Sequence, residues 1–217
     1  MAPSPLAASA VGGWVSYATW TNDAGTPITL FETSWVVPPE PENQSGQEIY
    51  LFNGLQNAAK EYILQPVLQW GIRSGVEGSG AFWTVSSWWV PPAPDGPPIF
   101  VPHPVVRVKS GDTLTGRIQA VPRSDSLVDY SCEFVGIPGT KLTKEFQELT
   151  NCVEVLEAYG VNDKADYPAT QRTKFFGIRV RVGAGVPDLV WDVGGAFPPD
   201  VLDNSATAGE VDIVYPT

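Results

Sequence analysis

The chain has 217 residues, a formal net charge of −11 and an isoelectric point near 4.4. Nucleic acid and anionic lipid surfaces would repel such a chain, so we expect neither nucleic-acid nor membrane partners. Charged residues make up only 17% of the sequence, and 21 Gly and 21 Pro supply turn formers. This composition favours many short strands over helices.

The length fits a single domain, because β-sandwiches and barrels of this size are commonly one unit. We interpret residues 1–217 as one β-sandwich with a loose N-terminal arm (1–12) and a Gly- and Pro-rich C-terminal extension (183–217). We expect a monomer. The first residues lack the basic and apolar regions of a signal peptide. We therefore expect a secreted protein if such a peptide has been removed, and a cytoplasmic one otherwise.

Strand-like segments follow one another along the chain, with turn signals between them. They cover residues 14–20, 31–37, 49–52, 62–70, 81–90, 113–121, 128–135, 141–146, 152–160, 173–182 and 211–215. The pair Asn53-Gly54 predicts a turn after the third segment, and a Pro-rich loop that runs to Pro104 follows the fifth. Segment 152–160 also fits a short helix.

Apolar and polar residues alternate most clearly in segments 113–121 and 173–182, as half-buried antiparallel strands require. The residues of the second segment expected to point inward are Phe176, Ile178, Val180 and Val182. These patterns predict an all-β fold, a two-sheet antiparallel β-sandwich of the concanavalin A-like or jelly-roll type.

Several classes of site are excluded by the residues that the chain lacks. One His and two Cys cannot supply four nitrogen or sulfur ligands, so we expect no metal and no cofactor. His103 lies between two prolines, with no Gly-x-Ser-x-Gly motif to accompany it, and we interpret it as an incidental loop residue. Cys132 and Cys152 lie on segments expected to be close in the sheet. A disulfide is therefore plausible, and two buried thiols are the alternative.

The segment 62–70 carries two amides that a strand would place on one face. Gln65 and Gln69 would share that face with Ile63 and Val67, because side chains two and four residues apart point the same way. A buried amide without a partner costs about 1–3 kcal/mol, so two amides among apolar residues suggest a functional site. The alternatives are a solvent-facing strand face or a structural hydrogen bond.

The segment 152–160 places Glu154 and Glu157 within apolar sequence, where burial would raise the pKa of a carboxyl group. In a strand the two glutamates would lie on opposite faces, so at most one would point into any given cleft. In a helix they would be neighbours. A partly exposed glutamate is the alternative to a functional one.

In their order, several segments resemble the fungal glutamic peptidases, or eqolisins. The matching segments are 33–41, 49–54, 63–65, 82–89, 110–112, 139–146 and 153–159, so the resemblance extends over about residues 14 to 182. It implies a lectin-like two-sheet sandwich and a Gln/Glu catalytic dyad. Gln65 matches the catalytic glutamine, and Glu154 is the better match for the catalytic glutamate, with Glu157 as the alternative.

The sequence departs from the family pattern near the implied dyad. The Asp-Gly of the family is Asn53-Gly54 here, Pro66 replaces a threonine, and Gln69 replaces an aspartate. The two glutamates of the family are four residues apart, whereas these are three apart. These departures predict either a changed pH optimum or a loss of peptidase activity.

The resemblance therefore leads to one main functional hypothesis, an acid endopeptidase of the glutamic type, which hydrolyses polypeptides. One alternative is a non-catalytic lectin-like or peptide-binding relative that uses the same cleft. Another is a carboxylate enzyme active on glycosides, since the same sandwich class also hosts glucanases. The residues expected to bind a polypeptide or glycan substrate are Gln69, Trp70, Trp83, Trp88 and Asn53. Core packing is the alternative role for the tryptophans.

Overall fold

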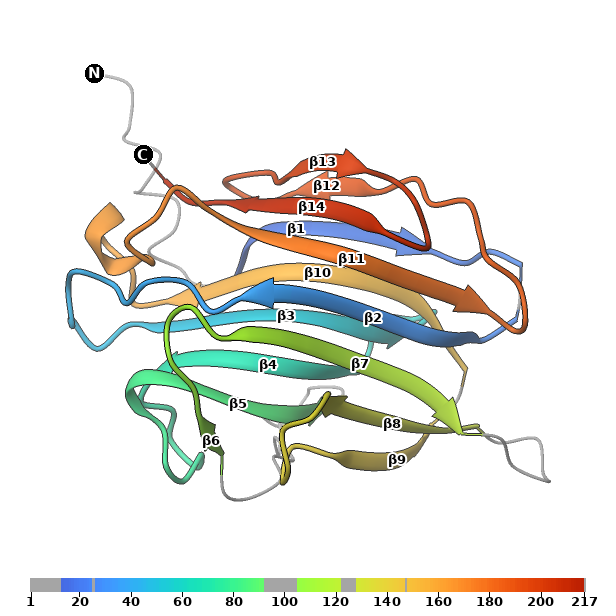
Figure 1. Cartoon of the computed structure of the whole chain (residues 1–217), viewed down its shortest axis with the longest axis horizontal. Helices are drawn as coiled ribbons and strands as arrows, with labels where there is room; N and C mark the ends of the chain where they lie inside the picture. Colours follow the sequence, from blue (N-terminus) through green and yellow to red (C-terminus); the bar gives the residue numbers. More distant parts are fainter. Residues whose placement is uncertain (1–12, 25, 92–104, 122–127, 147, 217) are drawn as a thin grey trace.

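The computed structural model describes residues 13–24, 26–91, 105–121, 128–146 and 148–216. Two antiparallel sheets of seven strands each lie face to face (Figure 1), which confirms the predicted sandwich. The expected N-terminal arm, His103 and the loop as far as Pro104 lie outside the described residues. Within the described ranges, no helix is long and apolar enough to cross a membrane.

We call the sheet that carries the segments of interest sheet A. In spatial order, its strands are β12 (Asp192–Gly194), β1 (Gly13–Thr21), β10 (Leu149–Tyr159), β3 (Glu48–Asn57), β4 (Ile63–Gly71), β5 (Gly80–Val90) and β6 (Val106–Arg107).

The opposing sheet B, in spatial order, contains β13 (Asp200–Asp203), β14 (Gly209–Val214), β11 (Arg172–Val182), β2 (Ile28–Val36), β7 (Thr113–Val121), β8 (Val128–Phe134) and β9 (Leu142–Phe146). A short 3-10 helix, η2 (Lys164–Asp166), connects β10 to β11. The C-terminal segment supplies an edge strand to sheet A and two strands to sheet B.

The segment 152–160 is strand β10, and the predicted turn at Asn53-Gly54 is wrong. Strand β3 continues through this pair to Asn57, because β10 pairs along its whole length, with Gly54 opposite Val153. Glycine is required here by close packing rather than by a turn. A Cβ atom on Gly54 would lie 2.7 Å from Cδ1 of Ile63.

Strand β11 also differs from prediction at one position. A bulge lies between Phe176 and Ile178, where Gly177 adopts a φ of 61°. The bulge reverses the alternation, so Phe175 rather than Phe176 is fully buried in the core, while Ile178 and Val180 point inward as predicted. Such a bulge adds one residue to a strand and leaves no simple period-2 signal.

The core fills the space between the sheets, and it contains the largest aromatic side chains. Trp35 packs against Phe175 with ring centroids 5.0 Å apart, and Trp70 packs against Trp83 at 5.4 Å. Burial of side chains of this size contributes about 1.5–3 kcal/mol each.

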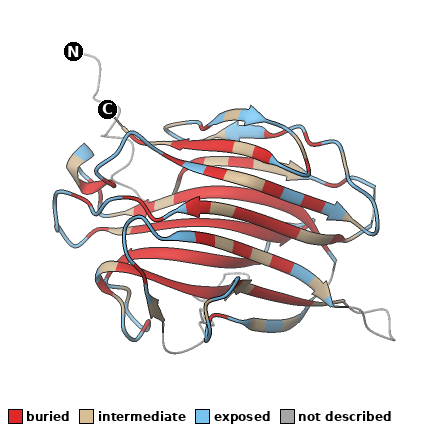
Figure 2. Ribbon diagram, in the orientation of Figure 1, coloured by how far each residue is buried: buried red, intermediate tan, exposed pale blue. Residues whose placement is uncertain are grey.

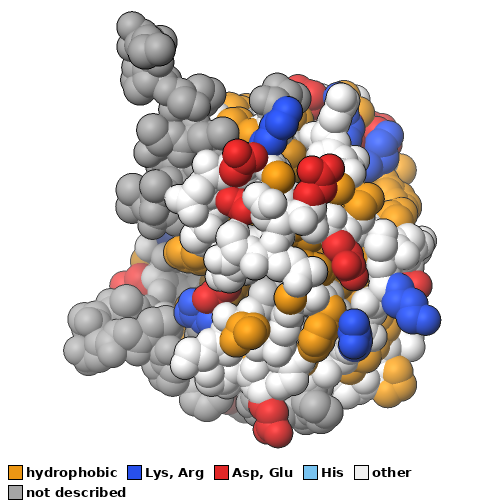
Figure 3. Space-filling view, turned by 90° about the vertical axis from the view of Figure 1, so that its left-hand side faces the viewer, with side chains coloured by type: hydrophobic (Ala, Val, Ile, Leu, Met, Phe, Trp, Pro, Cys, Tyr) orange, Lys and Arg blue, Asp and Glu red, His pale blue; other side chains and the backbone are white. Residues whose placement is uncertain are grey.

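The two outer faces differ in character. On sheet B, cross-strand ion pairs such as Arg117–Glu32 (2.6 Å) and Arg179–Glu32 (3.2 Å) face solvent. On sheet A, a second apolar cluster covers the outer face of the central strands. Figure 2 shows the effect of this second cluster on burial. Strands β3, β4 and β10 are buried along nearly their whole length, whereas burial alternates along the strands of sheet B. At the end of the sandwich shown in Figure 3, acidic, basic and hydrophobic side chains are intermixed.

Cys132 and Cys152 are both buried free thiols, which is the alternative named above to a disulfide. Cys132 lies on strand β8 of sheet B, and this strand packs against β4 and β5. Cys152 lies on strand β10 of sheet A, and this strand packs against β2 and β14. The two thiols therefore lie on opposing sheets. Burial raises the pKa of both.

Candidate functional site

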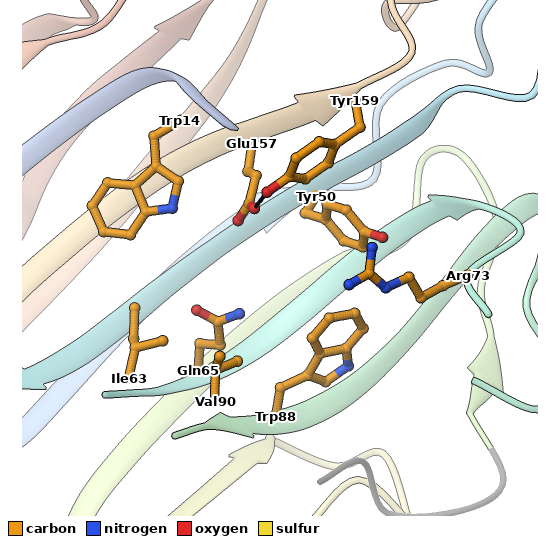
Figure 4. Close-up of a pocket in the computed structure, with 9 residues that line it drawn as sticks. All are labelled: Trp14, Tyr50, Ile63, Gln65, Arg73, Trp88, Val90, Glu157 and Tyr159. Carbon is orange, nitrogen blue, oxygen red and sulfur yellow. Dashed lines mark hydrogen bonds between the residues drawn. The ribbon is translucent and has the colours of Figure 1, made fainter. Parts of the chain in front are cut away.

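A cavity of about 200 Å³ lies on the outer face of sheet A. Its walls come from β1, β3, β4, β5, β10 and the loop that follows β4. The nine residues that line it (Figure 4) are Trp14, Tyr50, Ile63, Gln65, Arg73, Trp88, Val90, Glu157 and Tyr159.

Gln65 lies in the middle of β4, on the same face as Ile63 and Val67, as the alternation predicts. Its side chain is only 4% exposed, and Oε1 has no hydrogen-bond partner among the described residues. The ladder between β3 and β4 is interrupted beside it, because Pro66 has no N–H to donate. Figure 4 shows the Gln65 amide and the Glu157 carboxylate facing each other across the cavity.

Glu157 lies on β10, where the Tyr159 hydroxyl donates a hydrogen bond to its Oε1. Burial raises the pKa of Glu157 above its ordinary value, and the nearby Glu48 adds to the rise. The hydrogen bond from Tyr159, the neighbouring Trp14 indole and the positive charge of Arg73 act in the opposite direction.

Two Glu-x-Tyr motifs pair with each other at this site, one on β3 and one on β10, in antiparallel register. Glu157 is opposite Tyr50 in the ladder between β10 and β3, and Tyr159 is opposite Glu48. The Tyr50 hydroxyl donates to Glu48, which also pairs with Nη1 of Arg73 at 3.2 Å. Sequence reasoning missed these roles, although the repeated two-residue spacing places each Glu and Tyr on one face.

Glu154, the preferred catalytic glutamate from sequence, lies on the other face of β10. It is 0% exposed, and the hydroxyl of Thr33 on sheet B donates to its Oε1 at 2.5 Å. Burial raises the pKa of Glu154 well above its ordinary value, although the Thr33 hydrogen bond lowers it. Because alternate residues of a strand point to opposite faces, the structure brings Gln65 together with Glu157 and not with Glu154.

The residues predicted to bind substrate are divided between the two faces of sheet A. Trp88 lines the cavity, and Gln69 lies on the same face, where its Nε2 donates to the carbonyl of Gly71 at 3.0 Å. The other three residues lie between the sheets and do not reach the cavity: Trp70, Trp83 and Asn53. Trp70 and Trp83 therefore have the core-packing role named above as the alternative.

The chemical capacity of the cavity comes from its carboxylate and amide groups. In the part of the chain that the structure describes, no three His, Cys, Asp or Glu residues form a group that could hold a metal ion. A carboxylate with a raised pKa can accept or donate a proton, and an amide N–H can stabilise negative charge on an oxygen. Four aromatic rings, those of Trp14, Tyr50, Trp88 and Tyr159, line the space around these groups.

No protein-family model matches the chain, and no curated protein does. Solved structures do share its fold at low sequence identity. One is a scytalido-glutamic peptidase with a peptide-based transition state analog, at a TM-score of 0.57 and 15% identity, covering 94% of this chain and 98% of the other. Another is SCP-B, a member of the eqolisin family of peptidases, in a complex with the tripeptide Ala-Ile-His. It has a TM-score of 0.55 and 14% identity, with the same coverage.

Proposed function

We propose that this chain, a divergent relative of the eqolisin peptidases that shares their fold, hydrolyses peptide bonds with a dyad of Gln65 and Glu157. One observation carries the proposal: the amide of Gln65 and the carboxylate of Glu157 face each other in a cavity on sheet A. The similar folds bind peptides or peptide-based inhibitors, which favours a polypeptide as the substrate.

In this mechanism the ionised carboxylate of Glu157 is the general base. It takes a proton from a water molecule as the water oxygen bonds to the carbonyl carbon of the substrate. The carbonyl oxygen becomes an oxyanion, to which the amide N–H of Gln65 donates a hydrogen bond. Loss of one such donor typically lowers kcat about 100- to 1,000-fold.

The second half of the reaction returns the proton. Glu157, now protonated, donates to the nitrogen of the leaving amine while the C–N bond breaks and the oxyanion collapses to a carboxylic acid. The hydrogen bond from Tyr159 keeps the carboxylate of Glu157 in place throughout. Glu157 thereby performs both proton transfers without a further titratable group.

The raised pKa of Glu157 affects the pH range in which the proposed hydrolysis can proceed. A general base must be ionised, so activity rises with pH through the pKa of Glu157, which lies above the ordinary glutamate value of 4.5. We therefore propose that the acid limb of the profile has its midpoint above pH 4.5. The proposed enzyme would therefore be active at less acidic pH than an acid endopeptidase.

The experiment is hydrolysis of an unfolded protein substrate between pH 3 and pH 8. Gln65→Ala and Glu157→Gln should each remove activity while the near-ultraviolet circular dichroism stays native. Their losses should be non-additive, because the two residues act as one unit. Glu154→Gln is the matched control: it changes the other glutamate of β10 in the same way and should retain turnover. Loss of activity in Glu154→Gln but not in Glu157→Gln would reverse the assignment.

Peptide binding without hydrolysis is the second candidate function. The observation that favours it is the aromatic wall of Trp14, Tyr50, Trp88 and Tyr159, which suits a bound apolar side chain without any chemistry. In that case a peptide mixture would yield saturable binding, no product at any pH, and a loss of affinity in Trp88→Ala.

A further inference from the structure

Arg73 is the only basic residue among the described residues that line the cavity. It lies two residues beyond the end of β4, the strand that carries Gln65. Its side chain is 34% exposed. Figure 4 shows the guanidinium pointing into the cavity from one end, on the side to which the amide nitrogen of Gln65 is turned.

The guanidinium is held by an ion pair with Glu48. Nη1 pairs with Glu48, and Glu48 also accepts from Tyr50, whose ring packs on Trp88 at 5.4 Å. The backbone of Arg73 is fixed as well, because its N–H donates to Oγ of Ser79 at 3.1 Å. A guanidinium has five N–H donors. The described contacts use Nη1, which leaves the donors on Nε and Nη2 for a ligand.

The charges around the cavity show what Arg73 would add. The titratable groups that face it are Glu48 and Tyr50 on β3 and Glu157 and Tyr159 on β10. Hydrolysis would place a new negative charge beside Gln65, whose amide is a neutral donor. A positioned cation in a partly dry site stabilises such a charge more strongly than a neutral donor does.

We infer that Arg73 is a second donor to the oxyanion, which acts together with the amide of Gln65 when the tetrahedral intermediate forms. This inference rests on the proposed function. The fixed guanidinium, the free donors and the shared cavity carry it. The effect of Arg73 on Glu157, whose pKa it lowers, is consistent with a cation close to the reacting groups.

The test compares Arg73→Met and Arg73→Lys with wild type on two unrelated peptides. Arg73→Met should lower kcat about 10- to 1,000-fold on both peptides, with KM changed less than about threefold, because the interaction exists only in the transition state. Arg73→Lys should recover part of kcat, since it keeps the charge but loses the fork geometry. Arg179→Met is the matched control, because it breaks an Arg–Glu pair on the far face of sheet B.

An unchanged kcat in Arg73→Met would overturn the inference, and so would a loss confined to KM or to one peptide. If wild type shows no turnover, the proposed function fails, and a phosphinic peptide then tests Arg73 by calorimetry. Its anionic tetrahedral group mimics the intermediate, and Arg73→Met should bind it at least about tenfold more weakly than wild type does, a loss within the range of charge-assisted hydrogen bonds. Equal affinity, or no binding by wild type, would count against Arg73.

Discussion

The hydroxyl of Thr33 on β2 donates to Oε1 of Glu154 on β10, at 2.5 Å, across the interface between the two sheets. The other carboxyl oxygen of Glu154 is buried and has no hydrogen-bond partner in the described ranges. Asn53, its neighbour in the ladder, likewise has a buried carbonyl oxygen without a partner there. A protonated Glu154 has an O–H to donate, so this environment suits the neutral acid.

Glu154→Gln should therefore change stability in a pH-dependent way. The pKa of Glu154 is raised in the folded protein, so unfolding releases its proton at pH values between about 4.5, the value for an unperturbed glutamate, and the folded pKa. This release lowers the stability of wild type as pH rises from 4.5 toward the folded pKa, and glutamine has no proton to release. Urea unfolding should show that the variant gains stability relative to wild type between pH 4 and pH 7. A constant difference would contradict the raised pKa.

Thr33→Val should destabilise the fold, because it keeps the side-chain volume but removes the donor to Glu154. Loss of a partner to a buried polar group costs about 1–3 kcal/mol. Urea unfolding at pH 4 measures the loss. Ser34→Ala, which removes the hydroxyl that contacts Thr115 on the outer face of the same strand, is the control and should cost less. Equal losses of stability would show that the hydrogen bond between Thr33 and Glu154 contributes no more than the one on the outer face.

Tyr159→Phe should move the titration of Glu157 to higher pH. The Tyr159 hydroxyl lowers the pKa of Glu157, so the variant has a further raised pKa and an acid limb displaced upward. Carbon-13 NMR of the glutamate carboxyl groups follows this shift whether or not the protein is active. Tyr50→Phe is the matched control, since the Tyr50 hydroxyl donates to Glu48 instead. A shift of Glu157 in the control but not in Tyr159→Phe would reject the assigned donor.

Gly54→Ala should destabilise the protein by about 1–3 kcal/mol, the usual cost of overpacking a filled site. The added methyl group would lie 2.7 Å from Cδ1 of Ile63 and 3.1 Å from Cγ2 of Val153. Ile63→Val removes the first of these atoms, so the double variant should recover part of the loss. Additive losses in a double-mutant cycle would mean that the strain lies elsewhere.

The thiols of Cys132 and Cys152 should both react after denaturation without a reducing agent, because neither is in a disulfide. In the native protein both should resist a thiol reagent, since burial raises the pKa of each and blocks access. Ellman titration in the two states decides this. Fewer than two reactive thiols after denaturation would indicate an oxidised pair.

The sequence predicted much of the fold, because alternation along β7 and β11 and the turn residues between segments are local signals. It also placed Gln65 and Gln69 on one face, and Glu154 and Glu157 on opposite faces. It did not determine which face forms the cavity, since β3, β4 and β10 are buried on both sides. Arg73 was missed because its role depends on where the loop after β4 folds back. The periodicity of the sequence does not predict the course of this loop.

Strand β10 follows the other cavity-forming segments in the chain, although it lies at the centre of sheet A between β1 and β3. Trp14 and Glu157 meet only after this strand has paired with β1. During synthesis the growing chain therefore lacks an assembled dyad until residue 157 has emerged and long-range pairing is complete, a slow step in folding. Under the proposed function, a chain built in this order cannot hydrolyse unfolded copies of itself before it has folded.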